Sequence, residues 1–270
     1  GTIGWRFESQ PSSPAHWSHP MRNLATILAT SAIAVGLSLS VHAASVTLES
    51  GPERVSLVEL YTSEGCSSCP PADKWVSALR DDTRLWHQFV AVAFHVDYWD
   101  YIGWKDRFAE AAYSARQRSH ASLGNVRSVY TPGFVVNGAE WRAWFRRAPL
   151  PLPNDKPGRL RAIIEGDTVE VTYAPSAAID GRFEIVVARL GFDLSSQIKA
   201  GENAGKYLAH DFVVLGVTKT TLQQGADEHA ARLKLPATDH AGGTAGLAVW
   251  VTAPGQQRPI QALGGYLRTP

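Results

Sequence analysis

The chain has 270 residues, of which 44% are hydrophobic and 10% aromatic, and its formal net charge is +1. This length allows one large or two modest domains, and the apolar content is sufficient for hydrophobic cores. The 26 basic and 25 acidic residues are nearly balanced, which gives no general basic surface for nucleic acid or an anionic membrane. We therefore expect a globular protein without a nucleic-acid partner.

The N-terminal segment has the pattern of an export signal. Residues 1–20 show no periodicity and are interpreted as an upstream or non-native extension. Residues 21–44 combine a short basic start, an apolar run over 24–39 and small residues around Ala43, which predicts a secretory signal peptide. The alternative is a membrane anchor, but the run is short for a span of about 20 residues. We expect a periplasmic or secreted bacterial protein, free of the membrane after cleavage, in a compartment where disulfides persist.

The next part of the sequence alternates strand-like and helix-like segments. Apolar runs rich in β-forming residues predict strands, and apolar residues at helical spacing predict helices, the second of them opened by Asp106 as N-cap. A strand–helix–strand–helix–strand order predicts an α/β arrangement with at least one parallel pair. The segments are residues 55–61, 70–79, 89–96, 106–121 and 134–138.

A Pro-rich stretch at residues 149–158 interrupts this pattern and predicts an extended linker. Short β-type runs separated by turn residues follow it, and they predict a β-sandwich-like domain over residues 159–270. In the same half, Gly201 to Gly205 is a dense polar segment that we interpret as a glycine-permitted loop between strands. The β-type runs are residues 160–164, 168–173, 183–190, 212–217, 230–235, 247–252 and 260–263.

The two cysteines of the chain, Cys66 and Cys69, are separated by Ser67 and Ser68 and lie between a predicted strand and a predicted helix. A thiol at a helix N-terminus faces unpaired backbone N–H groups and the positive end of the helix dipole, which lower its pKa. Cys66 would then be the attacking thiol, and Cys69 would resolve the mixed disulfide. Pro70 is compatible with a helix that starts here.

The alternative interpretation of the pair is a static disulfide. A four-residue loop removes little chain entropy, so such a bond stabilises less than the about 3 kcal/mol expected for a 15-residue loop. Solvent exposure would discriminate the two interpretations. An exposed Cys66 sulfur beside Pro132 favours redox activity, and a buried, fully packed disulfide favours the static bond.

The strand, the Cys-x-x-Cys pair, the helix and the later Tyr130-Thr131-Pro132 before a strand resemble the thioredoxin superfamily. The resemblance implies an α/β thioredoxin-like domain over residues 53–148, with a central mixed sheet and flanking helices. It implies that Pro132 is a cis-proline beside the cysteines, and that Thr131 and Tyr130 bind substrate. It also implies that Glu59 is a buried acid that exchanges a proton with Cys69.

A second resemblance covers nearly the whole mature chain, to an exported bacterial family known only as domain of unknown function 1223. This resemblance implies an architecture and a compartment but no reaction. The strings that carry it are residues 58–73, 95–100, 103–106, 130–138 and 201–203.

A polar and aromatic cluster follows the strand at residues 89–96. Ligand sites of open α/β sheets lie beyond the carboxyl ends of strands, so Asp97 and Trp99 are candidate substrate-binding residues near the thiols. The alternative is that Asp97 caps a turn and the aromatic residues fill the core. His95 is a possible third ligand, with the two cysteines, for Cu(I) or Zn.

These patterns favour an exported thiol–disulfide oxidoreductase that acts through Cys66 and Cys69 on protein or small-molecule disulfides. We expect no cofactor and no resident metal for this reaction. One alternative is a non-enzymatic binding module with a structural disulfide, and a second is a Cu- or Zn-binding metal chaperone.

Overall fold

The computed structural model describes residues 45–177, 181–239 and 245–267. The predicted extension at 1–20 and the predicted signal peptide at 21–44 lie outside these residues. Within the described ranges, none of the helices is long and apolar enough to cross a membrane.

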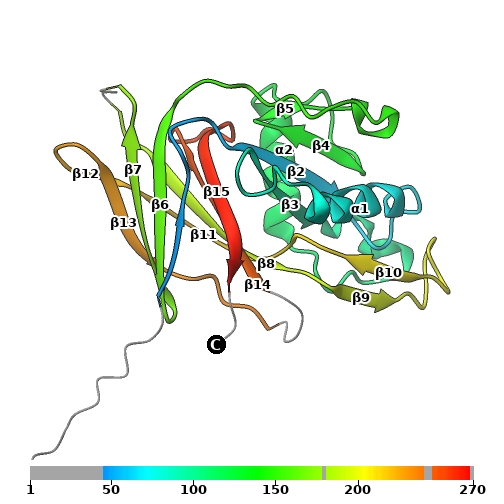
Figure 1. Ribbon diagram of the computed structural model, residues 1–270. Coiled ribbons are helices and arrows are strands. Elements are labelled where there is room, and N and C mark those ends of the chain that lie inside the picture. Colours follow the sequence, from blue (N-terminus) through cyan, green and yellow to red (C-terminus); the bar gives the residue numbers. More distant parts are fainter. Residues whose placement is uncertain (1–44, 178–180, 240–244, 268–270) are drawn as a thin grey trace, which may run out of the picture. The chain divides into compact units, whose positions relative to one another are not determined.

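Strands from both halves of the sequence form one eight-stranded sheet, in the order β15-β14-β8-β11-β3-β2-β4-β5 (Figure 1). β2 pairs in parallel with β3, and β3 pairs in parallel with β11, whereas the other neighbours are antiparallel. This sheet therefore contains strands from before and after the linker predicted at residues 149–158. Its strands are β2 (Ser56–Thr62), β3 (Phe89–His95), β4 (Gly133–Val136), β5 (Ala139–Glu140), β8 (Glu184–Gly191), β11 (Val213–Thr221), β14 (Ala245–Thr252) and β15 (Pro259–Leu267).

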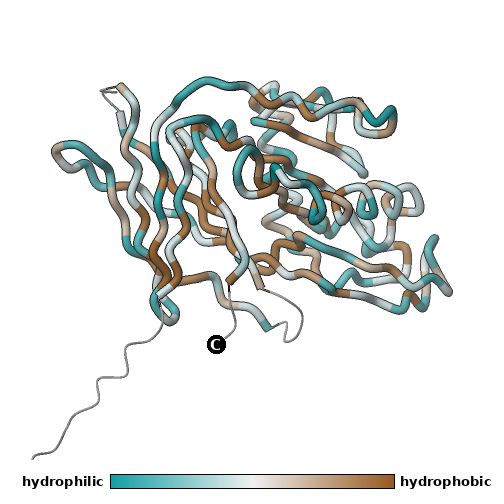
Figure 2. The backbone as a smooth tube through the Cα atoms, viewed as in Figure 1, coloured by the Kyte–Doolittle hydropathy of each residue, from teal (hydrophilic) through white to brown (hydrophobic). Residues whose placement is uncertain are grey.

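A five-stranded sheet in the order β1-β6-β7-β13-β12 packs against one end of the larger sheet. Figure 2 shows hydrophobic residues along the facing strands and hydrophilic residues at turns. A separate two-stranded sheet pairs β9 with β10. The strands of these two sheets are β1 (Val46–Glu49), β6 (Gly158–Glu165), β7 (Thr168–Pro175), β12 (Gln223–Gln224), β13 (His229–Lys234), β9 (Leu194–Gln197) and β10 (Tyr207–His210).

Two hydrophobic cores share β8 and β14. Alternate residues of a strand point to opposite faces, and here both faces are covered. Val249 of β14 packs into the core between the two sheets, whereas its neighbour Trp250 packs into the core that contains β2 and β3. Burial on both faces explains why β14 is apolar along most of its length.

The helices α1 (Pro70–Ser77) and α2 (Ala111–Ser122) cover opposite faces of β2 and β4. Trp75 of α1 contacts Phe134, which lies across from Leu60. Tyr61, on the other face of β2, contacts His120 of α2. The short 3₁₀ helices are η1 (Ala78–Asp81), η2 (Asp97–Ile102) and η3 (Ala143–Arg146).

The expected fold class, an α/β thioredoxin-like domain with flanking helices followed by a β-sandwich-like domain, is wrong. Of the described residues, 42% lie in strands and 16% in helices, and the strands form several sheets with few helices. The physical reason is the pairing of β3 with β11, which joins Ala93 to Val213 and extends the sheet with β8, β14 and β15. A pairing between residues so distant in sequence leaves no trace in local periodicity.

The second helix begins later than expected. Its N-cap is Glu110, and no side-chain hydrogen bond caps it. Asp106 therefore does not open the helix. Its side chain is buried and accepts hydrogen bonds from the backbone N–H groups of Glu64 and Phe108.

Candidate functional site at the Cys66–Cys69 disulfide

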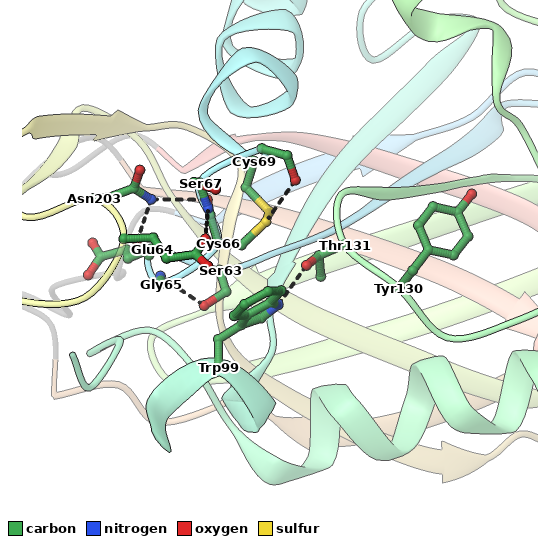
Figure 3. The surroundings of a disulfide bond; sticks show 12 residues. Ser63, Glu64, Gly65, Cys66, Ser67, Cys69, Trp99, Tyr130, Thr131 and Asn203 are labelled. Carbon is green, nitrogen blue, oxygen red and sulfur yellow. Dashed lines mark hydrogen bonds between the residues drawn. A yellow bond between two sulfur atoms is a disulfide. The ribbon is translucent and has the colours of Figure 1, made fainter. Parts of the chain in front are cut away.

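Cys66 and Cys69 form a disulfide in the turn that leads from β2 into α1 (Figure 3). Their Cα atoms are 5.4 Å apart, and Cys69 is the N-cap residue of α1. Both cysteines are buried, with exposed fractions of 1% and 0%, whereas Ser67 and Ser68 between them are exposed. Because a buried disulfide is expected of a static bond, this burial favours the static interpretation.

The hydroxyl oxygen of Ser68 lies 3.3 Å from the sulfur of Cys66. In the reduced protein this hydroxyl could donate a hydrogen bond to a Cys66 thiolate. The backbone of the turn is tightly held, because the N–H of Cys69 donates to the carbonyl of Cys66 over 3.2 Å. The carbonyl of Cys69 in turn accepts the N–H groups of Ala72 and Asp73, the first bonds of α1.

The loop between β9 and β10 forms hydrogen bonds to the cysteine turn. The amide Nδ2 of Asn203 donates to the carbonyls of Glu64 and Cys66, over 2.8 and 3.0 Å (Figure 3). Asn203 is fully buried, and Lys206 donates to its side-chain oxygen. The backbone N–H of Ser67 donates to a carboxylate oxygen of Glu202. The loop at residues 201–205 is therefore a support of the site and not only a connection.

Trp99 joins the cysteine turn to the segment before β4. Its indole N–H donates to the hydroxyl of Thr131 over 2.7 Å (Figure 3). A Cβ on Gly65 would come within 3.1 Å of the Trp99 Cβ, so the absence of a side chain at Gly65 permits this close packing. The peptide bond between Thr131 and Pro132 is cis. The structure thus brings Trp99 and Thr131 to the edge of the cysteine turn.

Two surface pockets lie near the site. One, of about 470 Å³, includes Ser68 of the cysteine turn in its lining, and the other, of about 360 Å³, is lined by residues of α1 and β10. The larger pocket is lined by Ser68 and Pro132, together with the aromatic residues Tyr130, Trp144 and Phe145. Pockets of this size with aromatic walls and a few polar groups are typical of ligand sites.

Glu59 lies on the face of β2 that α2 covers. Its carboxylate accepts hydrogen bonds from Arg116 Nε over 2.8 Å and from the Tyr61 hydroxyl over 2.9 Å, and His120 Nε2 lies 3.4 Å away. Burial alone would raise the pKa of Glu59, but the charges of Arg116 and His120 outweigh it and lower the pKa to about 2. None of these contacts reaches Cys69, and a carboxylate held ionised is a poor proton carrier at neutral pH.

Two further predicted residues have hydrogen-bond partners other than the cysteines. Asp97 begins η2, and it accepts a hydrogen bond from the hydroxyl of Ser114 on α2. His95 ends β3, where its Nδ1 lies 2.7 Å from an oxygen of Asp106. Burial would lower the pKa of His95, but the charge of Asp106 and its hydrogen bond raise it to about 8. The structure groups His95 with Asp106 and not with the cysteines.

Several residues at this site were not assigned a role from the sequence. Ser68, Trp144 and Phe145 line the pocket, while Asn203 and Glu202 support the turn. The only signal for the last two was the string at residues 201–203, which formed part of the family resemblance. Because this string lies more than 130 residues from the cysteines, the sequence did not reveal that Asn203 and Glu202 contact the cysteine turn.

Comparisons with known proteins identify a family and two similar structures. A sequence profile described as "Protein of unknown function (DUF1223)" matches residues 57–252. The chain is similar to protein AGR_C_4864 from Agrobacterium tumefaciens, with 27% identity and a TM-score of 0.53 over 80% of this chain and 95% of that chain. It is also similar in fold to HBP35 of Porphyromonas gingivalis, with 13% identity and a TM-score of 0.58 over 81% of this chain and 76% of that chain. No curated protein matches the chain.

Proposed function

The chain belongs to the DUF1223 family of proteins of unknown function, and we propose from its own site that it catalyses thiol–disulfide exchange through Cys66 and Cys69. The observation that carries the proposal is the position of the pair. The disulfide ends at the N-cap residue of α1, and Ser68 within its turn borders a pocket that Pro132 and aromatic side chains line.

The proposed reaction exchanges one disulfide for another. A substrate thiolate attacks the sulfur of Cys66, the Cys66–Cys69 bond breaks, and Cys69 leaves as a thiolate. A second substrate thiol, as its thiolate, attacks the substrate sulfur of this mixed disulfide. The products are an oxidised substrate and the protein with two thiols, so two electrons and two protons pass to the protein. In the opposite direction the Cys66 thiolate attacks a substrate disulfide.

Local contacts support Cys66 as the sulfur that the substrate meets. The Ser68 hydroxyl beside it can donate to a thiolate, and a hydrogen bond to the charged form lowers a pKa. Cys69 is covered by the start of α1 and is fully buried. The aromatic walls of the pocket favour a substrate, protein or small molecule, with an apolar group close to its sulfur.

Burial of both sulfurs requires that the turn at Ser67 and Ser68 move aside before a substrate can reach Cys66. The proposal therefore includes this local opening, with the pocket as the approach. We place the reaction in the periplasm or outside the cell, where the signal-like residues 21–44 would direct the chain.

The test is turnover of a disulfide substrate by the full chain, with Cys66→Ser and Cys69→Ser as variants. We expect both substitutions to abolish turnover, and Cys69→Ser to accumulate a mixed disulfide on Cys66 because no resolving thiol remains. Turnover by the wild-type chain no faster than by Cys66→Ser would refute the proposal. A mixed disulfide formed on Cys69 in Cys66→Ser, with none on Cys66 in Cys69→Ser, would reverse the two roles.

The second candidate function is a binding module in which the disulfide is structural. The exposed fractions of 1% and 0% at the two cysteines favour it. A partner that binds equally well to the wild-type chain and to the Cys66→Ser, Cys69→Ser double variant, together with absent exchange activity, would support this candidate.

A further inference from the structure

Three buried polar side chains from three different elements lie close together. Asp73 comes from α1, His95 from the end of β3 and His210 from the end of β10. Their ligand-type atoms all lie within 4.8 Å of one another. Glu64, which is also buried, brings its Oε1 to 3.3 Å from Nε2 of His210.

The atoms that face one another in this group lack hydrogen-bond partners. Among residues 45–177, 181–239 and 245–267, no group forms a hydrogen bond with Nε2 of His95 or Nδ1 of His210. Nε2 of His210 and Oε1 of Glu64 lie 3.3 Å apart without hydrogen-bond geometry, and the carboxyl group of Asp73 has the hydroxyl of Thr62 as its neighbour. A buried polar atom without a partner costs about 1–3 kcal/mol, and a charged one costs more. A cation bound among these closely spaced ring nitrogens and carboxylate oxygens would satisfy them.

Asp106 contacts His95 in the way that carboxylates contact metal-binding histidines. Its Oδ2 lies 2.7 Å from Nδ1 of His95 and also accepts the N–H of Glu64, while its Oδ1 accepts the N–H of Phe108. A carboxylate that holds one ring nitrogen of a histidine leaves the other nitrogen directed at the ion. Here that other nitrogen is the unpartnered Nε2 of His95.

We propose that Asp73, His95 and His210 bind a divalent transition-metal ion, most simply Zn²⁺. Two imidazoles and carboxylate oxygens suit zinc and related ions rather than Ca²⁺ or Mg²⁺. Tetrahedral zinc with bonds of about 2.0–2.2 Å places its ligand atoms about 3.4 Å apart. The present spacing of up to 4.8 Å requires the ligand atoms to move about 1 Å closer together when an ion binds.

This site differs from the cysteine–histidine site considered from the sequence, because it uses neither thiol. A second pocket, of about 360 Å³, lies between α1 and β10 and is lined by Asp73 and His210. It gives the ion a route from the surface. Lys74 and Asp211 stand at the same pocket.

A bound ion would connect α1, which begins at the disulfide, with β3 and β10. β10 belongs to the hairpin whose loop supplies Asn203, so the ion would hold the loop that fastens the cysteine turn. The role inferred from this position is structural: the metal fixes the support of the turn and takes no part in electron transfer. The competing arrangement is a metal-free cluster in which a protonated His95 offsets the charge of Asp73.

The test is a Zn²⁺ titration of the chelator-treated full chain, with the disulfide intact, against a chromophoric competitor. We expect one Zn²⁺ per chain and a loss of affinity of more than about 100-fold in Asp73→Asn and in His210→Gln. Asp106→Asn, which removes only the support of His95, should cost about 10–100-fold. His229→Gln is the matched control, because His229 is a buried histidine with an unpartnered Nδ1 outside this group, and it should bind as the wild type does.

Two further measurements keep the result decisive if a ligand variant fails to fold. Co²⁺ bound to the wild-type chain should show the visible bands of a tetrahedral site without sulfur-to-cobalt charge transfer. The Cys66→Ser, Cys69→Ser double variant should still bind Zn²⁺. Absence of stoichiometric binding, equal binding by the Asp73 and His210 variants, or loss of binding in the double serine variant would each overturn the proposal.

Discussion

Replacement of Glu59 by Gln tests how much the charges of Arg116 and His120 around the buried carboxylate contribute to folding stability. The carboxylate is fully buried, and Arg116 lies 2.8 Å away while His120 lies 3.4 Å away. These charges lower the pKa of Glu59 from 4.5 to about 2. A carboxyl pKa lowered this far by folding corresponds to about 3 kcal/mol of folding stability at pH 7. Glu59→Gln should therefore lower the free energy of unfolding by about 3 kcal/mol, since it leaves Arg116 without its charge partner.

The pH dependence has a definite sign. A carboxyl group whose pKa is lower in the folded state stabilises the protein above its unfolded pKa, and the stabilisation is lost as the pH falls through the folded pKa. For Glu59 this window runs from about pH 4.5 down to about pH 2. The difference between wild type and Glu59→Gln should shrink by about 2 kcal/mol between pH 7 and pH 3.

Urea unfolding of both proteins over this pH range measures the effect, with Glu165→Gln as an exposed control that should change little at either pH. A difference that is small at pH 7, or that stays constant down to pH 3, would refute the reasoning. Comparison of the two proteins at each pH removes the contributions of the other carboxyl groups.

Three further substitutions test the contacts around the disulfide. Ser68→Ala should slow thiol–disulfide exchange and raise the pKa of Cys66 in alkylation assays. Ser67→Ala should have a much smaller effect on both, and equal effects of the two substitutions would contradict the role of the Ser68 hydroxyl. Asn203→Ala removes two buried hydrogen bonds, those to the carbonyls of Glu64 and Cys66, and should cost about 2 kcal/mol in urea unfolding. An unchanged midpoint would be inconsistent with support of the cysteine turn by Asn203. Trp99→Phe removes the hydrogen bond to Thr131 and should cost about 1 kcal/mol; a double-mutant cycle with Thr131→Val that shows no coupling would argue against it.

Local patterns predicted single elements well but not their assembly. The strand expected over 89–96 is β3 at Phe89–His95, and the run expected over 247–252 lies within β14. Periodicity reports which faces of a segment are buried, and it does not report which strand lies beside it. The pairing of β3 with β11 therefore could not be foreseen, and it was this pairing that made the expected fold class wrong.

The same limit applies to the site. The spacing of the cysteines and the turn position between strand and helix predicted a connected pair at the start of α1. Asn203, in the loop between β9 and β10, contacts Cys66, and His210, at the end of β10, contacts Glu64. No spacing in the sequence indicates these contacts. Asp106 was interpreted as a helix cap because capping residues and buried hydrogen-bond acceptors share the same chemistry.

The reduction potential of the Cys66–Cys69 pair tests the proposed exchange most directly. Exchange-active pairs have potentials between about −270 and −120 mV, whereas structural disulfides lie below about −300 mV. Equilibration of the full chain with glutathione or dithiothreitol buffers, followed by trapping of free thiols, gives the value. Our account predicts a potential within the exchange-active range, and a potential below about −300 mV would contradict it and favour a structural bond.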